Sequence, residues 1–217
     1  MFRLETKKDR SGNPQPLLLP PPMPRSAAFD RDEVLSRLLF LFWEKGYDGT
    51  SQADMVERAG ISSSSLYNAF GNKPDIFDAV AERYNAMMWG AMEPLREGTG
   101  GVADVAGFLG GVAEQTRGGQ TPPGCLMVRT MTELGGRAKA PATAEAHTCT
   151  YRDQVSDSVR AALARAAASG EIPPEAVEPR TQTVLALMLG AMAVGVTDRE
   201  AGAAMLENAR DLVRGWA

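Results

Sequence analysis

Residues 50–77 have the sequence TSQADMVERAGISSSSLYNAFGNKPDIF, and this stretch decides the fold. Hydroxyl side chains stand where helices prefer to start and glycines where they prefer to end. The pattern therefore predicts one short helix over residues 51–59 and another over residues 62–70. A three-residue turn centred on Gly60 separates them, as in a helix-turn-helix.

Helical patterns extend on both sides of this stretch. From Asp30 to Gly46, apolar residues recur at spacings of three and four, which predicts a longer supporting helix. No apolar-polar alternation typical of strands persists anywhere, so the sequence predicts an all-α protein. Glycines and prolines separate the further expected helices, at residues 74–93, 102–117, 124–137, 141–169, 175–197 and 200–216.

Several short pieces stand at fixed spacings in this region: Thr50-Ser51, Met55-Val56, Ala59-Gly60-Ile61-Ser62, Ser65-Leu66-Tyr67-Asn68-Ala69-Phe70, Gly71-Asn72-Lys73 and Ile76-Phe77. Together they resemble the DNA-binding signature of the tetracycline-repressor (TetR) family. The resemblance implies a three-helix helix-turn-helix DNA-binding domain at residues 29–73. A larger helical domain for effector binding and dimerisation would follow at residues 74–217.

The resemblance also implies which side chains meet DNA. Lys73 stands where a helix begins, and its ammonium adds to the positive helix end to favour a phosphate. The expected helix over residues 62–70, which would contact the bases, has no arginine or lysine. Base recognition would therefore rest on Asn68, whose side-chain amide suits adenine. Packing alone is the alternative for Tyr67, and helix capping alone for the serines. The expected contacts are Thr50, Ser51, Ser62, Ser63, Ser64, Tyr67, Asn68 and Lys73.

Residues 1–28 have a different composition from the rest of the chain. They are rich in proline and hold five basic against two acidic side chains. Such a segment cannot build a core, so we expect a disordered basic arm. Arg25, the arginine nearest the first helix, is our candidate for an added minor-groove contact.

The whole-chain composition sets limits on the other function classes. The formal net charge of −4 neither supports nor excludes nucleic acid, because phosphate contact is local. The apolar run at 184–196 is shorter than the roughly 18 residues of a membrane span, and no signal-peptide pattern starts the chain, so we expect a cytoplasmic protein. Two cysteines without CxxC spacing and one histidine indicate no disulfide framework, metal or cofactor.

Methionines and aromatic residues of the central helices suit an apolar ligand pocket. Residues 124–128 resemble the glycine-cysteine-hydrophobic motif of one TetR subgroup. Arg129 of this chain stands where that subgroup often has asparagine, so the ligand of the subgroup is not assumed. Ordinary core packing is the alternative for each pocket residue. Cys125 stands at an expected helix start that favours a thiolate, which makes a redox or electrophile sensor a second alternative. The expected pocket residues are Tyr84, Met88, Trp89, Met92, Phe108, Cys125, Met127, Arg129, Met131 and Tyr151.

The last two expected helices fit the TetR dimerisation pair. The final helix has an unbroken apolar stripe, and the helix before it is apolar nearly all round with small residues that permit close approach. A purely intramolecular core is the alternative. The expected dimer residues are Leu185, Leu189, Met192, Met205, Ala209, Leu212 and Trp216.

These features imply a ligand-responsive DNA-binding transcriptional regulator. Repression, with release from a palindromic operator by a small molecule, is the commoner mode in the TetR family. The expected partners are double-stranded operator DNA, a small-molecule effector and a second copy of the chain. The alternatives are a ligand-binding or thiol-based redox-sensing protein of the same fold, and a helical enzyme. The enzyme is disfavoured because GxGxxG, P-loop, HExxH and nucleophile-elbow motifs do not occur.

Overall fold

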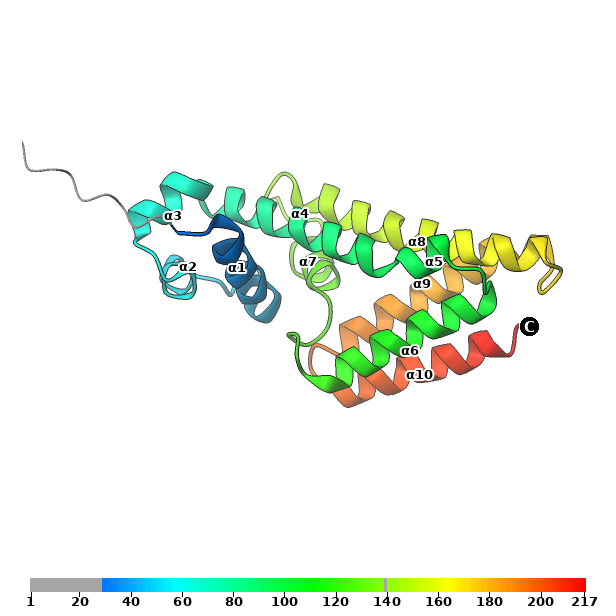
Figure 1. Ribbon diagram of the computed structural model, residues 1–217. Coiled ribbons are helices and arrows are strands. Elements are labelled where there is room, and N and C mark those ends of the chain that lie inside the picture. The colour runs from blue at the N-terminus through cyan, green and yellow to red at the C-terminus, as the bar shows by residue number, and fades with distance from the viewer. Residues whose placement is uncertain (1–28, 139) are drawn as a thin grey trace, which may run out of the picture.

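The computed structural model describes residues 29–138 and 140–217, and all regular elements in these ranges are helical (Figure 1). The all-α prediction is therefore confirmed. The expected basic arm, with Arg25, lies outside the described residues. In chain order the helices are α1 (Arg31–Lys45), α2 (Gln52–Ala59), α3 (Ser63–Phe70), α4 (Lys73–Ala91), α5 (Glu93–Glu97), α6 (Val102–Gly118), α7 (Leu126–Leu134), α8 (Ala144–Ala168), a 3-10 turn (Pro174–Ala176), α9 (Val177–Val194) and α10 (Arg199–Arg214).

Local capping explains where the N-terminal helices begin. The Asp30 carboxylate accepts the first free amides of α1. Ser51 and Asp54 form a reciprocal capping box at the start of α2, and Asn72 and Asp75 form another at the start of α4. Each box satisfies amides that have no partner inside the helix.

One short helix differs from the sequence prediction. Pro94 was expected to end the helix that starts near Lys73, at about residue 93. Instead α4 ends at Ala91, and Pro94 lies in the first turn of α5. Proline is well tolerated there because its missing N–H would have no partner in any case.

The helices form an elongated arrangement (Figure 1). α1, α2 and α3 gather at one end, α4 runs from that end along the molecule, and α8 lies beside α4. α6 and α10 lie side by side along the opposite edge, with α9 packed against α10. Buried side chains form one continuous apolar core, and the Trp43 ring meets the Tyr84 ring edge-on at 5.0 Å to join α1 to α4.

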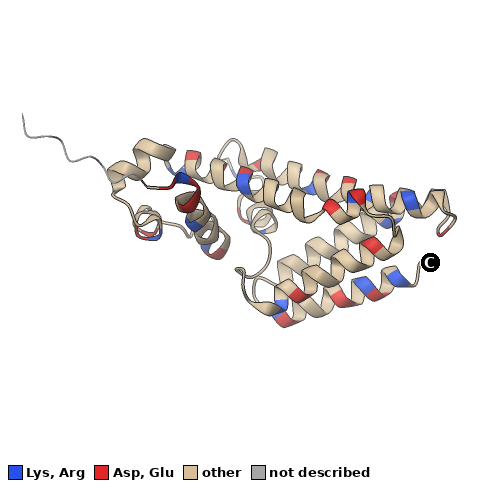
Figure 2. Cartoon of the chain, in the orientation of Figure 1, with Lys and Arg blue, Asp and Glu red and all other residues tan. Residues whose placement is uncertain are grey.

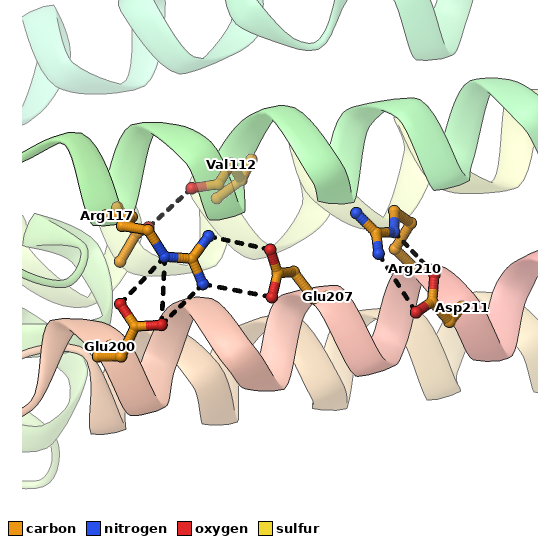
Figure 3. A network of polar contacts seen from close by, with 7 residues as sticks. Val112, Arg117, Glu200, Glu207, Arg210 and Asp211 are labelled. Carbon is orange, nitrogen blue, oxygen red and sulfur yellow. Dashed lines mark hydrogen bonds and ion pairs between the residues drawn. The ribbon is translucent and has the colours of Figure 1, made fainter.

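Charged residues are spread along most of the helices, and α3 has none (Figure 2). One cluster of charged side chains links α6 to α10 (Figure 3). The Arg117 guanidinium at the end of α6 donates to the carboxylates of both Glu200 and Glu207. These bonds raise the pKa of Arg117 and lower the pKa of both carboxyl groups. The three side chains are between 35% and 70% exposed, so their contribution to stability is small.

In the described ranges, the helices are all too short or too polar to cross a lipid bilayer.

Candidate nucleic-acid interface and ligand pocket

We use the term reading head for residues 29–73. Within it, Gly60 adopts a left-handed conformation, with φ 70° and ψ 22°, which turns the chain sharply from α2 into α3. Leu66 and Phe70 anchor the inner face of α3 in the core. The opposite face of α3 is exposed and carries Ser63 and Asn68. The helix therefore presents a polar surface on a buried support.

Two of the expected contact serines act as helix caps. The Ser51 hydroxyl lies 2.7 Å from a carboxylate oxygen of Asp54, and it accepts the amide of the same residue. The Ser62 hydroxyl accepts the amide of Ser65 at 3.1 Å and also contacts the Ser64 hydroxyl. Capping and DNA contact are compatible here, because all but Ser65 of these hydroxyl-bearing residues are exposed.

Two expected contact residues, Thr50 and Tyr67, have covered hydroxyl groups. Thr50 is fully buried, and its hydroxyl donates to the Gly46 carbonyl at 2.6 Å. Its side chain therefore belongs to the turn before α2 and not to an outer surface. The Tyr67 ring packs against the core, and its hydroxyl oxygen is covered with no partner among the described residues. This favours the packing alternative for Tyr67.

Lys73 is half-buried at the first position of α4. Its ammonium lies 4.4 Å from the centre of the Tyr47 ring, a cation-π contact that holds the charge in place. Burial lowers the pKa of Lys73, while the carboxylates of Asp48, Glu133 and Asp54 act in the opposite direction. The ammonium has no carboxylate within ion-pair distance among the described residues, so it is available to a phosphate.

The other cations of this region already have partners. Residues 30–84 hold six basic and ten acidic side chains. Arg31 donates to the Ala69 carbonyl and lies over the Phe70 ring. The ion pairs are Arg37–Glu33, Lys45–Asp54, Arg58–Glu44 and Arg83–Asp32. Lys73 is thus the best-placed cation beside α3.

An apolar cavity of about 60 Å³ lies between α1, α4, α6, α8, α9 and the loop before α7. Six of the expected pocket residues line it: Tyr84, Met88, Met92, Phe108, Cys125 and Tyr151. The sequence analysis missed Trp43 of α1 and Met188 and Met192 of α9, which also line it. The spacing of four between the two methionines places both on one helix face, and that was the available signal.

Four expected pocket residues lie elsewhere. Trp89 is 41% exposed, with the Arg96 guanidinium 3.6 Å from its ring centre. Met127 is fully buried in the core, and Arg129 does not line the cavity. Met131 lines a separate hollow between α7 and α8. Residue type alone predicted these four positions, whereas the rotation of each helix about its own axis determines which side chains face the cavity.

Cys125 caps the start of α7 and is buried. The Tyr84 hydroxyl donates to its Sγ at 3.1 Å. Burial raises the pKa of both Tyr84 and Tyr151 well above the usual value, so both hydroxyls stay protonated. Next to the thiol, the Trp43 indole N–H donates to the Gly124 carbonyl at 3.1 Å. The reading head therefore touches the cavity wall directly.

The expected dimer residues fall into three groups: buried, half-buried and exposed. Leu185, Met192 and Ala209 are buried in the protomer's own core. Their helix faces turn inward because α9 and α10 pack on other helices of the same chain. Leu189 and Trp216 are half-buried. Large apolar side chains remain on the outside of the pair: Val194 is 37% exposed, Met205 37% and Leu212 50%.

A helix-turn-helix with a polar outer face, joined to a helical body around an apolar cavity, defines a DNA-binding transcriptional regulator. The family model described as "Bacterial regulatory proteins, tetR family" matches residues 35–80. The HTH-type transcriptional repressor ComR of Escherichia coli K12 is 28% identical over 196 residues, which covers 88% of this chain and 91% of that repressor. Residues 35–80 thus match the DNA-binding domain of the TetR family, and the chain resembles transcriptional regulators along most of its length.

A solved structure supports this assignment across the whole body. A cysteine-substituted variant of the TetR-family regulator CifR, in complex with 26-base-pair operator DNA, matches with a TM-score of 0.75 and 27% identity. The match covers 89% of this chain and all of that one. The predicted fold class, the resemblance to the TetR family and the role as a DNA-binding regulator are therefore confirmed.

Proposed function

We propose that this regulator is a repressor that binds a two-fold symmetric operator as a homodimer and is released by an apolar small molecule. The single observation that carries the proposal is the exposed polar face of α3 beside the accessible ammonium of Lys73. The name of ComR, a repressor, and the operator complex of CifR support it by analogy. Such a protein acts in the cytoplasm, where the DNA is.

The proposed DNA interface is small and nearly uncharged. Asn68 reads a base through its amide, the short hydroxyls of Ser63 and Ser64 fit close to the groove, and Ser51 and Lys73 meet phosphates. Because the other cations of the reading head are engaged, few phosphates are neutralised. We therefore expect a shallow dependence of operator affinity on salt.

Replacing Lys73 by alanine should reduce the slope of log affinity against log salt by roughly 2 per dimer, since each lost phosphate contact contributes about 0.9. Operator and random-sequence affinity should fall alike. Asn68→Ala should instead keep the slope and relax specificity at one base pair per half-site, at a cost of about 1 to 3 kcal/mol. Fluorescence-anisotropy titrations at several salt concentrations measure both effects. A slope unchanged by Lys73→Ala would remove this lysine from the interface.

The proposed dimer face is the outer side of α9 and α10. Ala186 and Ala193 are exposed on α9 and allow close approach, while Val194, Met205 and Leu212 supply exposed apolar area. Large apolar side chains on one side of a helix pair are typical of a surface that another helix pair covers. A two-fold axis at this face would place two reading heads on one DNA duplex.

The cavity is the proposed effector site. Its walls are aromatic and sulfur-containing, and methionine adapts to ligands of varied shape. Its volume of about 60 Å³ is far below the roughly 300–1,000 Å³ of ordinary ligand sites. A ligand must therefore push walls apart, and one wall is Trp43 of the reading head. Linkage demands that a true effector bind less tightly once operator is present.

Thiol chemistry at Cys125 is a second candidate for the signal. The observation that favours it is a buried Sγ at a helix start that receives a hydrogen bond from Tyr84. The test compares operator affinity before and after exposure to hydrogen peroxide. A loss in the wild type that Cys125→Ser abolishes supports this candidate, and an equal loss in both proteins contradicts it.

The test of the proposed function is selection of bound fragments from genomic DNA, followed by release with candidate apolar ligands. Retention of a specific fragment in a gel shift, lost on ligand addition, is the expected result. A helical enzyme or a ligand-binding protein without DNA affinity would retain no fragment.

A further inference from the structure

The turn between α1 and α2 is held from outside the reading head. The backbone amides of Tyr47 and Asp48 both donate to the carboxylate of Glu133, at 3.0 and 2.6 Å. Glu133 lies on the last turn of α7, more than 80 positions further along the chain. Hydrogen bonds to an ionised carboxylate are among the stronger ones in proteins. One side chain of the body thus holds the backbone of the reading head.

The carboxylate lies directly against this turn. Gly46 has φ 77°, and a Cβ atom there would lie 2.5 Å from the nearer oxygen of Glu133. The turn is also closed internally, because the Thr50 hydroxyl donates to the Gly46 carbonyl and the Thr50 amide donates to the Tyr47 carbonyl at 3.2 Å. A displacement of Glu133 would therefore displace the turn as a unit. Ser51, at the start of α2, is the next residue after this turn.

The same carboxylate influences Lys73. The ring of Tyr47, whose amide Glu133 accepts, supports the Lys73 ammonium. Burial lowers the pKa of that lysine, and Glu133 is one of the carboxylates whose charge acts against this lowering. Both proposed phosphate contacts, Ser51 and Lys73, therefore depend on a turn that Glu133 holds.

The helix that carries Glu133 also reaches the cavity. α7 has nine residues and is about 14 Å long. Its first end is Cys125 in the cavity wall, and its last turn bears Glu133. The loop before it is tightly packed, because a Cβ atom at Gly124 would lie 2.8 Å from the Met192 carbonyl. The helix has little room to shift without moving its neighbours.

We propose that Glu133 is a positioning residue for operator recognition, which holds the α1–α2 turn and, through it, Ser51 and Lys73 in the geometry that fits the operator. The inference rests on the proposed function. Glu133 itself does not touch DNA. Its effect is transmitted by the two backbone hydrogen bonds.

A purely electrostatic role of Glu133 predicts a change in DNA affinity opposite to the change that a positioning role predicts. The inference is therefore testable. A carboxylate near a phosphate-binding lysine repels DNA, so a variant that only lost this charge would bind all DNA more tightly. A variant that lost the positioning would bind operator less tightly. Glu133→Gln separates the two roles, because the side chain keeps its shape and one acceptor oxygen but cannot accept both amides.

The experiment compares the full-length wild type with Glu133→Gln on the selected operator fragment and on a random-sequence duplex of equal length. We expect affinity to fall on both duplexes, and operator affinity to fall at least roughly tenfold, because Ser51 and Lys73 would contact the phosphates of either DNA. Amide hydrogen exchange should be faster at Tyr47 and Asp48 in the variant, with little change in the thermal midpoint.

Two matched variants serve as controls. Glu57→Gln removes an exposed acid of α2 that has no hydrogen-bond partner among the described side chains, and it should strengthen binding to both DNAs alike. Arg137→Ala removes the exposed ion pair between Arg137 and Asp48 at the same turn, and it should change operator affinity less than twofold.

Operator affinity of Glu133→Gln that equals or exceeds that of the wild type would overturn the inference. Unchanged amide exchange at Tyr47 and Asp48 would also overturn it. The exchange measurement needs no DNA, so it tests the hold on the turn even if the wild type retains no operator. In that case the proposed function fails separately.

Discussion

Replacing Met205 and Leu212 together by glutamate should convert the protein to a monomer and lower its operator affinity at least roughly a hundredfold. Both side chains are exposed on the outer face of α10, so the changes leave the protomer's core intact. At a two-fold interface each substitution appears twice, which would place four carboxylates in an apolar contact. The loss of affinity follows because a second linked reading head raises binding roughly 10²- to 10⁴-fold.

Light scattering at micromolar concentration and titration of the operator fragment measure both effects. Met87→Glu is the matched control, since Met87 is an equally exposed methionine on α4 and not on the proposed dimer face. It should leave the dimer and the affinity unchanged. A double variant that remains a dimer would place the interface elsewhere on the molecule.

Gly202→Val should be among the most destabilising single changes in the chain, at about 3 kcal/mol of unfolding free energy. A Cβ atom at Gly202 would lie 2.7 Å from the Cα of Gly195 and 2.9 Å from the Ala191 carbonyl oxygen. Both are backbone atoms, so α10 would have to move away from α9. For a chain of this size, the thermal midpoint should fall by roughly 6 to 12 °C.

Gly107→Ala is the matched control for this prediction. Gly107 lies within α6, and a Cβ atom there meets nothing within 4 Å. Alanine should stabilise the helix by about 0.5 to 1 kcal/mol through its better helix propensity. Calorimetry at one fixed protein concentration compares the two variants. Equal midpoints for Gly202→Val and the wild type would show that α9 and α10 do not pack as closely as described.

The helix-turn-helix could be predicted because its signals are local. Ser51, Gly60, Ser62 and Gly71 each act within a few residues, and each occupies the expected cap. The failure at Pro94 has the same origin, because a proline that ends one helix can equally begin the next.

The candidate sites were harder to predict because inward and outward faces depend on tertiary packing. α9 is apolar nearly all round, so periodicity could not show that Met192 faces the cavity rather than a second copy. Thr50 carried the family pattern, but its hydroxyl is used by the turn. Glu133 had no sequence signal, since its partners lie more than 80 positions away.

The account's central claim is that two symmetric copies of this reading head recognise one operator. A hydroxyl-radical footprint of the wild type on the fragment selected from genomic DNA tests it most directly. The account predicts two protected regions related by a two-fold axis, with centres one helical turn, roughly 34 to 36 Å, or a little more apart. A single asymmetric protected region shorter than one helical turn would contradict it.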